Sequence, residues 1–271
     1  MAVIAQMNLG ETAASYLPLL IPFALATVVA VTAGWLCQRI FEDIPFRGLG
    51  CSFTRGWLRN LAAGCLIGAV TFGSATIIAV MSGGISLSVN RESATSAILS
   101  TVGVTLVILL VGAASEETLF RGYLLQTFTR AKLLWFGIVL TSALFAFAHN
   151  GNPDAGKISL LNTFLAGIWF GMAYLKTRDL WFPFGIHAMW NWLQGPVFGI
   201  NISGLSSFAP DPVFRATDAG PVWLTGGSYG IEGGIACTFA IAVAIGLVQY
   251  MPGLKPDESM LRLTSEEEPA T

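Results

Sequence analysis

Long apolar runs, separated by short polar connections, occupy most of this 271-residue chain. An α-helix needs about 20 apolar residues to cross roughly 30 Å of hydrocarbon, and several of the runs reach this length. The predicted spans cover residues 17–38, 57–81, 98–129, 134–149, 158–176, 180–193 and 233–251. The pattern therefore predicts an all-α, polytopic transmembrane helix bundle.

Three of the runs depart from the usual length. The run at 98–129 would be roughly 48 Å long as a helix, so it either tilts or projects a tail into the cytoplasm. The runs at 134–149 and 180–193 are short enough to be half-embedded helices. An eighth span within 196–214 is an alternative, so the pattern predicts about seven to eight spans.

Basic residues lie mainly on alternate connections, and cytoplasmic loops carry an excess of Lys and Arg. Ten fall on one set of connections: Arg39, Arg47, Arg55, Arg59, Arg130, Lys132, Lys176, Arg178, Lys255 and Arg262. Three fall on the opposite set: Arg91, Lys157 and Arg215. With seven spans, this asymmetry predicts an N terminus outside the cell and a C terminus inside it.

The composition agrees with a membrane location and argues against other classes of protein. Hydrophobic residues make up 54% of the chain and charged residues 11%, and the mean hydropathy is +0.67, far from the values of soluble domains. A net charge of −2 without a basic aromatic stripe argues against nucleic-acid binding. The four cysteines show no paired spacing, so we assign them no chemistry. The short loops favour a multi-pass protein of the bacterial plasma membrane.

A few polar side chains interrupt the apolar runs, where a charge at a helix centre costs about 2.5–3.5 kcal/mol on insertion scales. The chain has two histidines, and both are in this set. Counting along the helices places the set at similar depths, so its members can meet inside the membrane. The set, with one flanking aromatic residue, is Glu116, Glu117 and Arg121 in EETLFR, Phe145 and His149 in FAFAH, and His187 and Asn191 in HAMWN.

Helical spacing separates the two glutamates. Glu117 and Arg121 are i,i+4 neighbours with the acid first, so we expect a structural ion pair. Glu116 lies about 100° around the helix and needs another partner. We expect this partner to be His149, which comes from an adjacent helix and can share a water with the carboxylate. Together the two groups would activate that water.

The third pair suits a different step of the same chemistry. His187 and Asn191 are also i,i+4 neighbours, so both side chains lie on one face of their helix. Two donors aimed at a common point are the arrangement that stabilises a developing oxyanion. The three pairs together predict one hydrolytic centre.

In chain order, the three blocks read EExxxR, FxxxH and HxxxN. This order in membrane helices resembles the CPBP family, the CAAX prenyl endopeptidase and bacteriocin-processing group, also called the Abi family of intramembrane proteases. The resemblance covers about residues 98–193 and implies a type II CAAX-endopeptidase-like helical core that hydrolyses peptide bonds. It implies that Glu116 and His149 activate water while His187 and Asn191 hold the oxyanion. Supporting roles would fall to Glu117, Arg121 and Phe145.

A metal ion is the open alternative for this chemistry. Family members are often labelled metalloproteases, and Glu116, His149 and His187 offer carboxylate and imidazole ligands that zinc accepts. The chain has no HExxH pair on one helix. The sequence therefore leaves open two hypotheses, water activated by glutamate without a metal and water bound to zinc.

We divide the chain into four regions by these features. Residues 1–97 hold N-terminal spans, 98–193 form the catalytic three-motif core, and 194–251 comprise an outer loop and the final span. The Gly- and Pro-rich outer loop is either a lid or a linker. Residues 252–271 form an acidic cytoplasmic tail that we expect to be disordered.

Two other classes of function fit part of the pattern. A proton-coupled transporter also places Glu and His at the membrane midplane, but the chain shows no internal repeat. A non-catalytic membrane scaffold would keep the cluster only to hold helices together. GGSYG, around Ser228, matches a nucleophile elbow, but we expect no strand there and interpret it as a turn. The substrate we expect is a peptide or membrane protein that enters from the cytoplasm or from lipid; the oligomeric state is left open.

Overall fold

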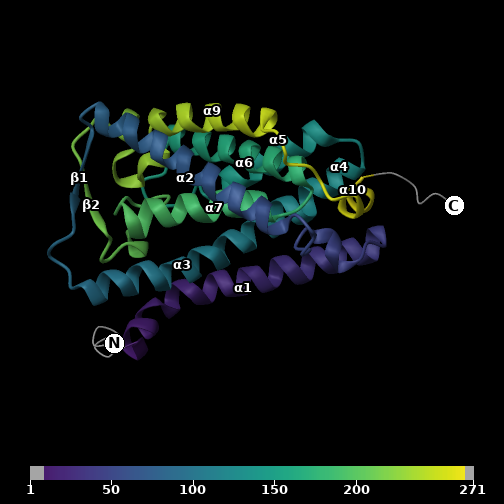
Figure 1. Ribbon diagram of the computed structural model, residues 1–271, viewed down its shortest axis with the longest axis horizontal. Helices are drawn as coiled ribbons and strands as arrows, with labels where there is room; N and C mark the ends of the chain where they lie inside the picture. The colour runs from purple at the N-terminus through teal and green to yellow at the C-terminus, as the bar shows by residue number, and fades with distance from the viewer. Residues whose placement is uncertain (1–8, 266–271) are drawn as a thin grey trace.

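Helices aligned with the long axis of the molecule build the fold, as the computed structural model shows for residues 9–265 (Figure 1). One helix lies at each predicted span: α1 (Leu9–Glu42), α2 (Trp57–Met81), α3 (Thr95–Glu117), α5 (Leu134–Ala148), α6 (Lys157–Thr177), α7 (Trp181–Trp192) and α9 (Ile235–Tyr250). The third span is longer than α3, because the π-helix η3 (Thr118–Leu125) and α4 (Gln126–Arg130) continue it. The predicted all-α bundle is therefore confirmed.

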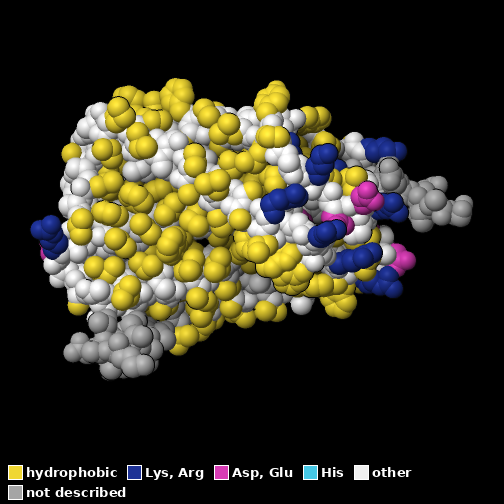
Figure 2. Space-filling model, viewed as in Figure 1, with side chains coloured by type: hydrophobic (Ala, Val, Ile, Leu, Met, Phe, Trp, Pro, Cys, Tyr) yellow, Lys and Arg dark blue, Asp and Glu magenta, His cyan; other side chains and the backbone are white. Residues whose placement is uncertain are grey.

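The surface of the bundle is apolar, as expected for helices in contact with lipid. Within residues 9–265, four helical segments are long and apolar enough to cross a membrane: α1, α2, the continuous helix Thr95–Arg130 and α6. α5 and α9 are shorter apolar helices. Figure 2 shows hydrophobic side chains over the middle of the molecule, and Leu25, Phe147 and Phe239 are among the large exposed ones. The chain is therefore an integral membrane protein.

Charged side chains gather at the ends of this apolar band. Lys and Arg crowd the end that carries α4 and α10 (Glu258–Thr264), while few lie at the opposite end, beside the small sheet (Figures 1 and 2). We refer to these as the basic end and the sheet end. The positive-inside rule predicts that the basic end is cytoplasmic.

The sheet end carries two strands that the hydrophobic pattern did not predict. β1 (Ile85–Val89) pairs antiparallel with β2 (Phe214–Asp218), with Ile85 opposite Asp218 and Val89 opposite Phe214. Since the partners are far apart in sequence, no hairpin signal marks them. The sheet ties the outer loop to the connection between α2 and α3.

The outer region between α7 and α9 is irregular, as predicted. Its helical pieces are short: η4 (Leu193–Val197), η5 (Ser206–Phe208), α8 (Val222–Thr225), η6 (Gly227–Tyr229) and η7 (Ile231–Gly233). The structure places no membrane-length helix within 196–214, because proline and glycine recur too closely there. Ser228 lies in η6, which agrees with its interpretation as a turn residue.

The tail after residue 252 is partly ordered, which corrects the predicted disorder. α10 begins after Asp257, whose side chain accepts a hydrogen bond from the Ser259 amide at 2.9 Å. Met260 and Thr264 are buried, and α10 contacts α4 and η2 (Phe46–Leu49). Burial of apolar side chains therefore stabilises residues 258–264, whereas the acidic run at 266–268, which favoured disorder in the sequence, lies outside the described residues. Residues 266–271 of the tail, like residues 1–8, lie outside the described part of the chain.

Small residues allow α2 and α7 to approach each other closely. A Cβ atom on Gly64 would collide with the Phe182 carbonyl oxygen, and one on Gly68 would lie 2.5 Å from the Ile186 carbonyl oxygen. Gly167 does the same between α6 and α5, where a Cβ atom would lie 2.7 Å from the α5 backbone. Small residues at these three positions therefore allow close helix–helix packing.

Gly64→Ala is expected to lower the free energy of unfolding by about 1–3 kcal/mol, because the methyl group would push α2 away from α7. Gly73, on the same helix, has no atom within 4 Å of a Cβ position. Gly73→Ala should therefore be neutral or stabilising by up to about 1 kcal/mol through helix propensity. Denaturant titration of both variants in mixed micelles measures the difference. Equal effects would contradict the close-packing role of Gly64.

Candidate active site

The candidate site residues lie where three of the spans meet inside the bundle. Glu116 and Glu117 are the last two residues of α3, and Arg121 lies in η3. η3 is a π-helix of eight residues, a rare conformation that is frequent at functional sites. His149 is the C-cap of α5, while His187 comes from α7.

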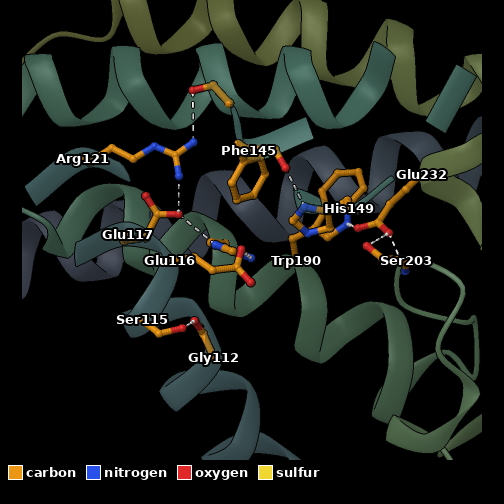
Figure 3. A network of polar contacts seen from close by, with 12 residues as sticks. Gly112, Ser115, Glu116, Glu117, Arg121, Phe145, His149, Trp190, Ser203 and Glu232 are labelled. Atoms are coloured by element: carbon orange, nitrogen blue, oxygen red, sulfur yellow. Dashed lines mark hydrogen bonds and ion pairs between the residues drawn. The ribbon is translucent and has the colours of Figure 1, made fainter. Parts of the chain in front are cut away.

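Glu117 is the buried centre of a three-residue polar network (Figure 3). Its Oε1 atom lies 3.2 Å from Arg121 Nη1 and 2.8 Å from His187 Nδ1. Arg121 is fully buried and donates a second hydrogen bond, from Nη2, to the Gly167 carbonyl oxygen at 3.2 Å. The predicted ion pair between Glu117 and Arg121 is therefore present. It also holds His187, a contact that helical spacing did not indicate.

Aromatic rings surround the buried cation of this network. The Arg121 guanidinium lies 4.8 Å from the centre of the Phe145 ring and 5.1 Å from that of Phe170. Such contacts stabilise a cation that water does not reach. The Phe170 ring also stacks on His187, with ring centres 4.9 Å apart. These packed rings restrict the orientation of both charged groups.

Glu116 borders a cavity and is less buried than its neighbour Glu117, although its Oε2 atom is itself buried. Its side chain is 27% exposed, and its Oε2 atom lies 3.9 Å from His187 Nε2. Oε2 accepts no hydrogen bond from any side chain or amide in the described chain. His187 thus faces both glutamates, with Nδ1 on Glu117 and Nε2 toward Glu116.

His149 lies at the end of α5 and bonds to its own helix. Its Nδ1 atom lies 2.8 Å from the Phe145 carbonyl oxygen, so Nδ1–H donates there and Nε2 is left for another partner. The ring centres of His149 and Phe145 are 4.7 Å apart. The expected pairing of His149 with Glu116 is not a direct contact; both residues line one cavity.

The cavity has a volume of about 380 Å³ and is lined by residues from all three sequence blocks. Apolar side chains form much of its wall, among them Phe23, Leu109 and Phe208. Its polar lining comprises Glu116, His149, Asn152, Asn162, Thr163, His187, Asn191, Ser203 and Glu232. All four residues predicted to be catalytic therefore border the same space. A volume of this size suits a few residues of a peptide.

Glu232 is a polar group of the cavity that the sequence analysis missed. Its Oε2 accepts hydrogen bonds from the amide and the hydroxyl of Ser203 at 2.7 and 2.8 Å (Figure 3). Its Oε1 accepts one from Trp190 Nε1 at 3.2 Å. The carboxylate thus fastens the outer loop to α7. The sequence offered one signal for Glu232: it is an acidic residue in the Gly-rich stretch directly before the last span. The hydrophobic pattern indicates only a loop for this stretch.

Further backbone contacts hold this part of the outer loop. The Gly204 amide donates to the Tyr229 carbonyl oxygen at 2.8 Å, and Gln194 Nε2 donates to the Asn201 carbonyl oxygen at 2.5 Å. Burial, together with the nearby Glu232 carboxylate, raises the pKa of the Tyr229 hydroxyl above its ordinary value. The phenol of Tyr229 therefore stays neutral. The two hydrogen bonds, from Gly204 and from Gln194, hold the outer loop beside the cavity.

The residues proposed as zinc ligands do not form a ligand set here. Within residues 9–265, no three His, Cys, Asp or Glu side chains are placed to hold one metal ion. The geometry therefore does not fit the zinc site that Glu116, His149 and His187 were expected to offer.

Comparison with known proteins agrees with the resemblance inferred from the blocks EExxxR, FxxxH and HxxxN. Residues 98–193 match the Rce1-like family, described as type II CAAX prenyl endopeptidase Rce1-like. An Escherichia coli protein described as an uncharacterized 24.3 kDa protein is 29% identical over 140 residues, which cover 49% of this chain and 62% of that protein. No solved structure matches. Because the matched segment contains all three blocks and the cavity residues they supply, residues 98–193 are similar to the Rce1-like, or CPBP, family, in agreement with the resemblance that the three blocks indicated.

Proposed function

We propose that this protein is an intramembrane endopeptidase that hydrolyses a peptide bond with a water activated by Glu116, in the plasma membrane of a bacterium. The observation that carries the proposal is the single cavity bordered by Glu116, His149, His187 and Asn191. Glu116 comes from α3, His149 from the end of α5, and His187 and Asn191 from α7. An acid, two imidazoles and an amide around one space are the groups that peptide hydrolysis needs.

The first step is the attack of water on the scissile carbonyl carbon. Glu116 accepts a proton from the water, because its carboxylate faces the cavity and its Oε2 has no protein donor. His149 holds the water with Nε2, since its Nδ1 is occupied by its own helix. Glu116 then passes the proton to the departing amine as the C–N bond breaks. Glu116 ends the cycle ionised, as it began.

The negative charge that develops on the carbonyl oxygen needs donors on the other side of the cavity. Asn191 supplies its amide group and His187 supplies Nε2–H in its protonated form. Glu117 accepts a hydrogen bond from His187 Nδ1 and so orients the ring, with Nε2 on the side of Glu116. Arg121 holds Glu117 in place, which makes Glu117 and Arg121 positioning residues rather than groups that touch substrate.

Chelation is expected to leave activity unchanged, because the geometry does not assemble three metal ligands. The purified protein would be treated with EDTA and with 1,10-phenanthroline, and cleavage compared with an untreated sample. A zinc protease of known chelator sensitivity serves as the control. Loss of cleavage that added zinc restores would overturn the metal-free mechanism.

The direct test of the proposal is cleavage of a membrane-peptide library by the purified protein, with products identified by mass spectrometry. Cleavage by the wild type that disappears in Glu116→Ala and His149→Ala supports the assignment. Equal product from all three proteins would defeat it. Proton-linked uptake into proteoliposomes, lost in Glu116→Gln, would instead favour a transporter.

A further inference from the structure

The cavity lies toward the sheet end of the molecule. It is lined by the end of α5 at Ala148 and His149, by Asn191 near the end of α7, and by Cys237 near the start of α9. These helix ends all point away from the basic end (Figure 1). Within the described chain, no cavity-lining residue belongs to a connection at the basic end.

Helix lengths place this half of the molecule within the outer part of the bilayer. α5 has 15 residues and α9 has 16. At about 1.5 Å per residue these helices rise roughly 22–24 Å, which is less than the roughly 30 Å of hydrocarbon. α5 starts at the basic end and α9 finishes there, so the opposite end of each helix lies short of the far border of the hydrocarbon. Irregular backbone is tolerated at such depth only where it is covered by protein or lines a water-filled cavity.

The route from the basic end into the cavity is closed by packed side chains. Glu117 and Arg121 follow Glu116 in the direction of the basic end, and they are 1% and 0% exposed. Beyond them, Tyr174 donates a hydrogen bond to Gln126 at 2.8 Å, and both residues are buried. A second buried apolar cluster fills the same region: Leu125, Ile138, Tyr174 and Leu180.

The sheet end of the cavity is less tightly closed. Asn152, Ser203 and Leu205 line the cavity and are each only half-buried. Their chain neighbours Gly151 and Ser206 are exposed. The mouth of the cavity is therefore framed by the connection after α5 and by the outer loop that Glu232 fastens to α7.

We propose that the cavity is loaded from the non-cytoplasmic side of the membrane. Its substrates would be peptide segments presented at or just inside the outer face of the bilayer, with an apolar side chain against the wall formed by Phe23, Leu109 and Phe208. The statement about substrates rests on the proposed endopeptidase function, whereas the side of entry does not. Of the two routes expected from the sequence, from the cytoplasm or from lipid, it replaces the cytoplasmic one, because the packed basic end offers no path to Glu116.

Cysteine labelling tests the side of entry without requiring any activity. In a background with the four native cysteines replaced, Asn152→Cys and Leu205→Cys are introduced singly at the mouth. Glu92→Cys is a marker for the sheet end and Glu258→Cys is a marker for the basic end. Both side chains can react with a label because they are 79% and 92% exposed. A membrane-impermeant maleimide is applied to intact spheroplasts and to inverted vesicles.

The expected result is that both mouth variants label in spheroplasts, together with Glu92→Cys, while Glu258→Cys labels only in inverted vesicles. Labelling of the mouth variants only in inverted vesicles would overturn the proposal, whether the chain is inserted the other way or the cavity opens at the basic end. Failure of both mouth variants to label from either side, while both markers label, would also overturn it, because the mouth would then be sealed.

A second measurement separates this proposal from the proposed function. Reporter proteins carry the same apolar test segment either outside or inside the membrane, and both are expressed with the wild type and with Glu116→Gln. Cleavage of the outer reporter alone, lost in Glu116→Gln, is expected. Cleavage of the inner reporter alone would overturn the side of entry. Outside labelling without cleavage of either reporter would count against the endopeptidase function and leave the side of entry standing.

Discussion

Glu116→Gln is expected to lower the rate of peptide cleavage by about 10²–10⁴-fold, because glutamine cannot accept the proton of the attacking water. The substitution preserves the size of the side chain, and Oε2 of Glu116 accepts no protein hydrogen bond that would be lost. The free energy of unfolding should therefore remain close to that of the wild type. Initial rates on a cleaved library peptide, measured beside unfolding curves, separate the two effects.

Glu258→Gln provides the matched control for this variant. Glu258 is 92% exposed on α10, and its ion pair with Arg262 lies on the surface. Its replacement should change neither cleavage nor stability. If Glu116→Gln destabilises the protein as much as it slows cleavage, Glu116 serves the fold and the non-catalytic scaffold becomes the better interpretation.

Arg121→Ala is expected to lower the free energy of unfolding by about 3–5 kcal/mol, because it leaves the buried Glu117 carboxylate without its cation. The lost contacts are the 3.2 Å ion pair, the bond to the Gly167 carbonyl oxygen and the stacking on aromatic rings. Cleavage should also fall, since His187 would lose part of its support. Denaturant titration and initial rates would measure the two losses.

Arg39→Ala provides a control for the removal of an arginine. Arg39 pairs with Asp43 four residues later, as Arg121 pairs with a residue four positions earlier, but its side chain is 57% exposed. The expected change in unfolding free energy is within about 1 kcal/mol. If Arg121→Ala were no more harmful than Arg39→Ala, Glu117 would have to be neutral and the ion pair would lack the role assigned to it.

The sequence predicted most of the helices correctly and erred where order depends on distant contacts. The helices could be recognised because each is an apolar run in the sequence, and four of the runs are long enough to cross a membrane, which is a local property. The pairing of β1 with β2 could not be recognised, because each strand is stabilised by a partner more than 100 residues away. The packing of α10 under the bundle was missed for the same reason, since Met260 is buried only by the surfaces of other elements.

The candidate site was found by a different kind of argument. Polar groups are expensive in hydrocarbon, so Glu116, Glu117, Arg121 and both histidines stood out from the sequence alone. Spacing along one helix also predicted the pair of Glu117 with Arg121, because i,i+4 neighbours meet whatever the rest of the fold does. The partner of each imidazole was not predictable in this way.

The sequence by itself determined that the chain crosses a membrane several times, which residues it keeps polar there, and which end is basic. Only the tertiary structure decided that His187 bonds to Glu117, that Glu232 fastens the wall of the cavity, and that the cavity opens toward the sheet end. The physical reason is that hydrophobicity and helical spacing are properties of one segment. Contacts between segments depend on how each helix is rotated and how deep it lies, and these are set by packing of the whole bundle.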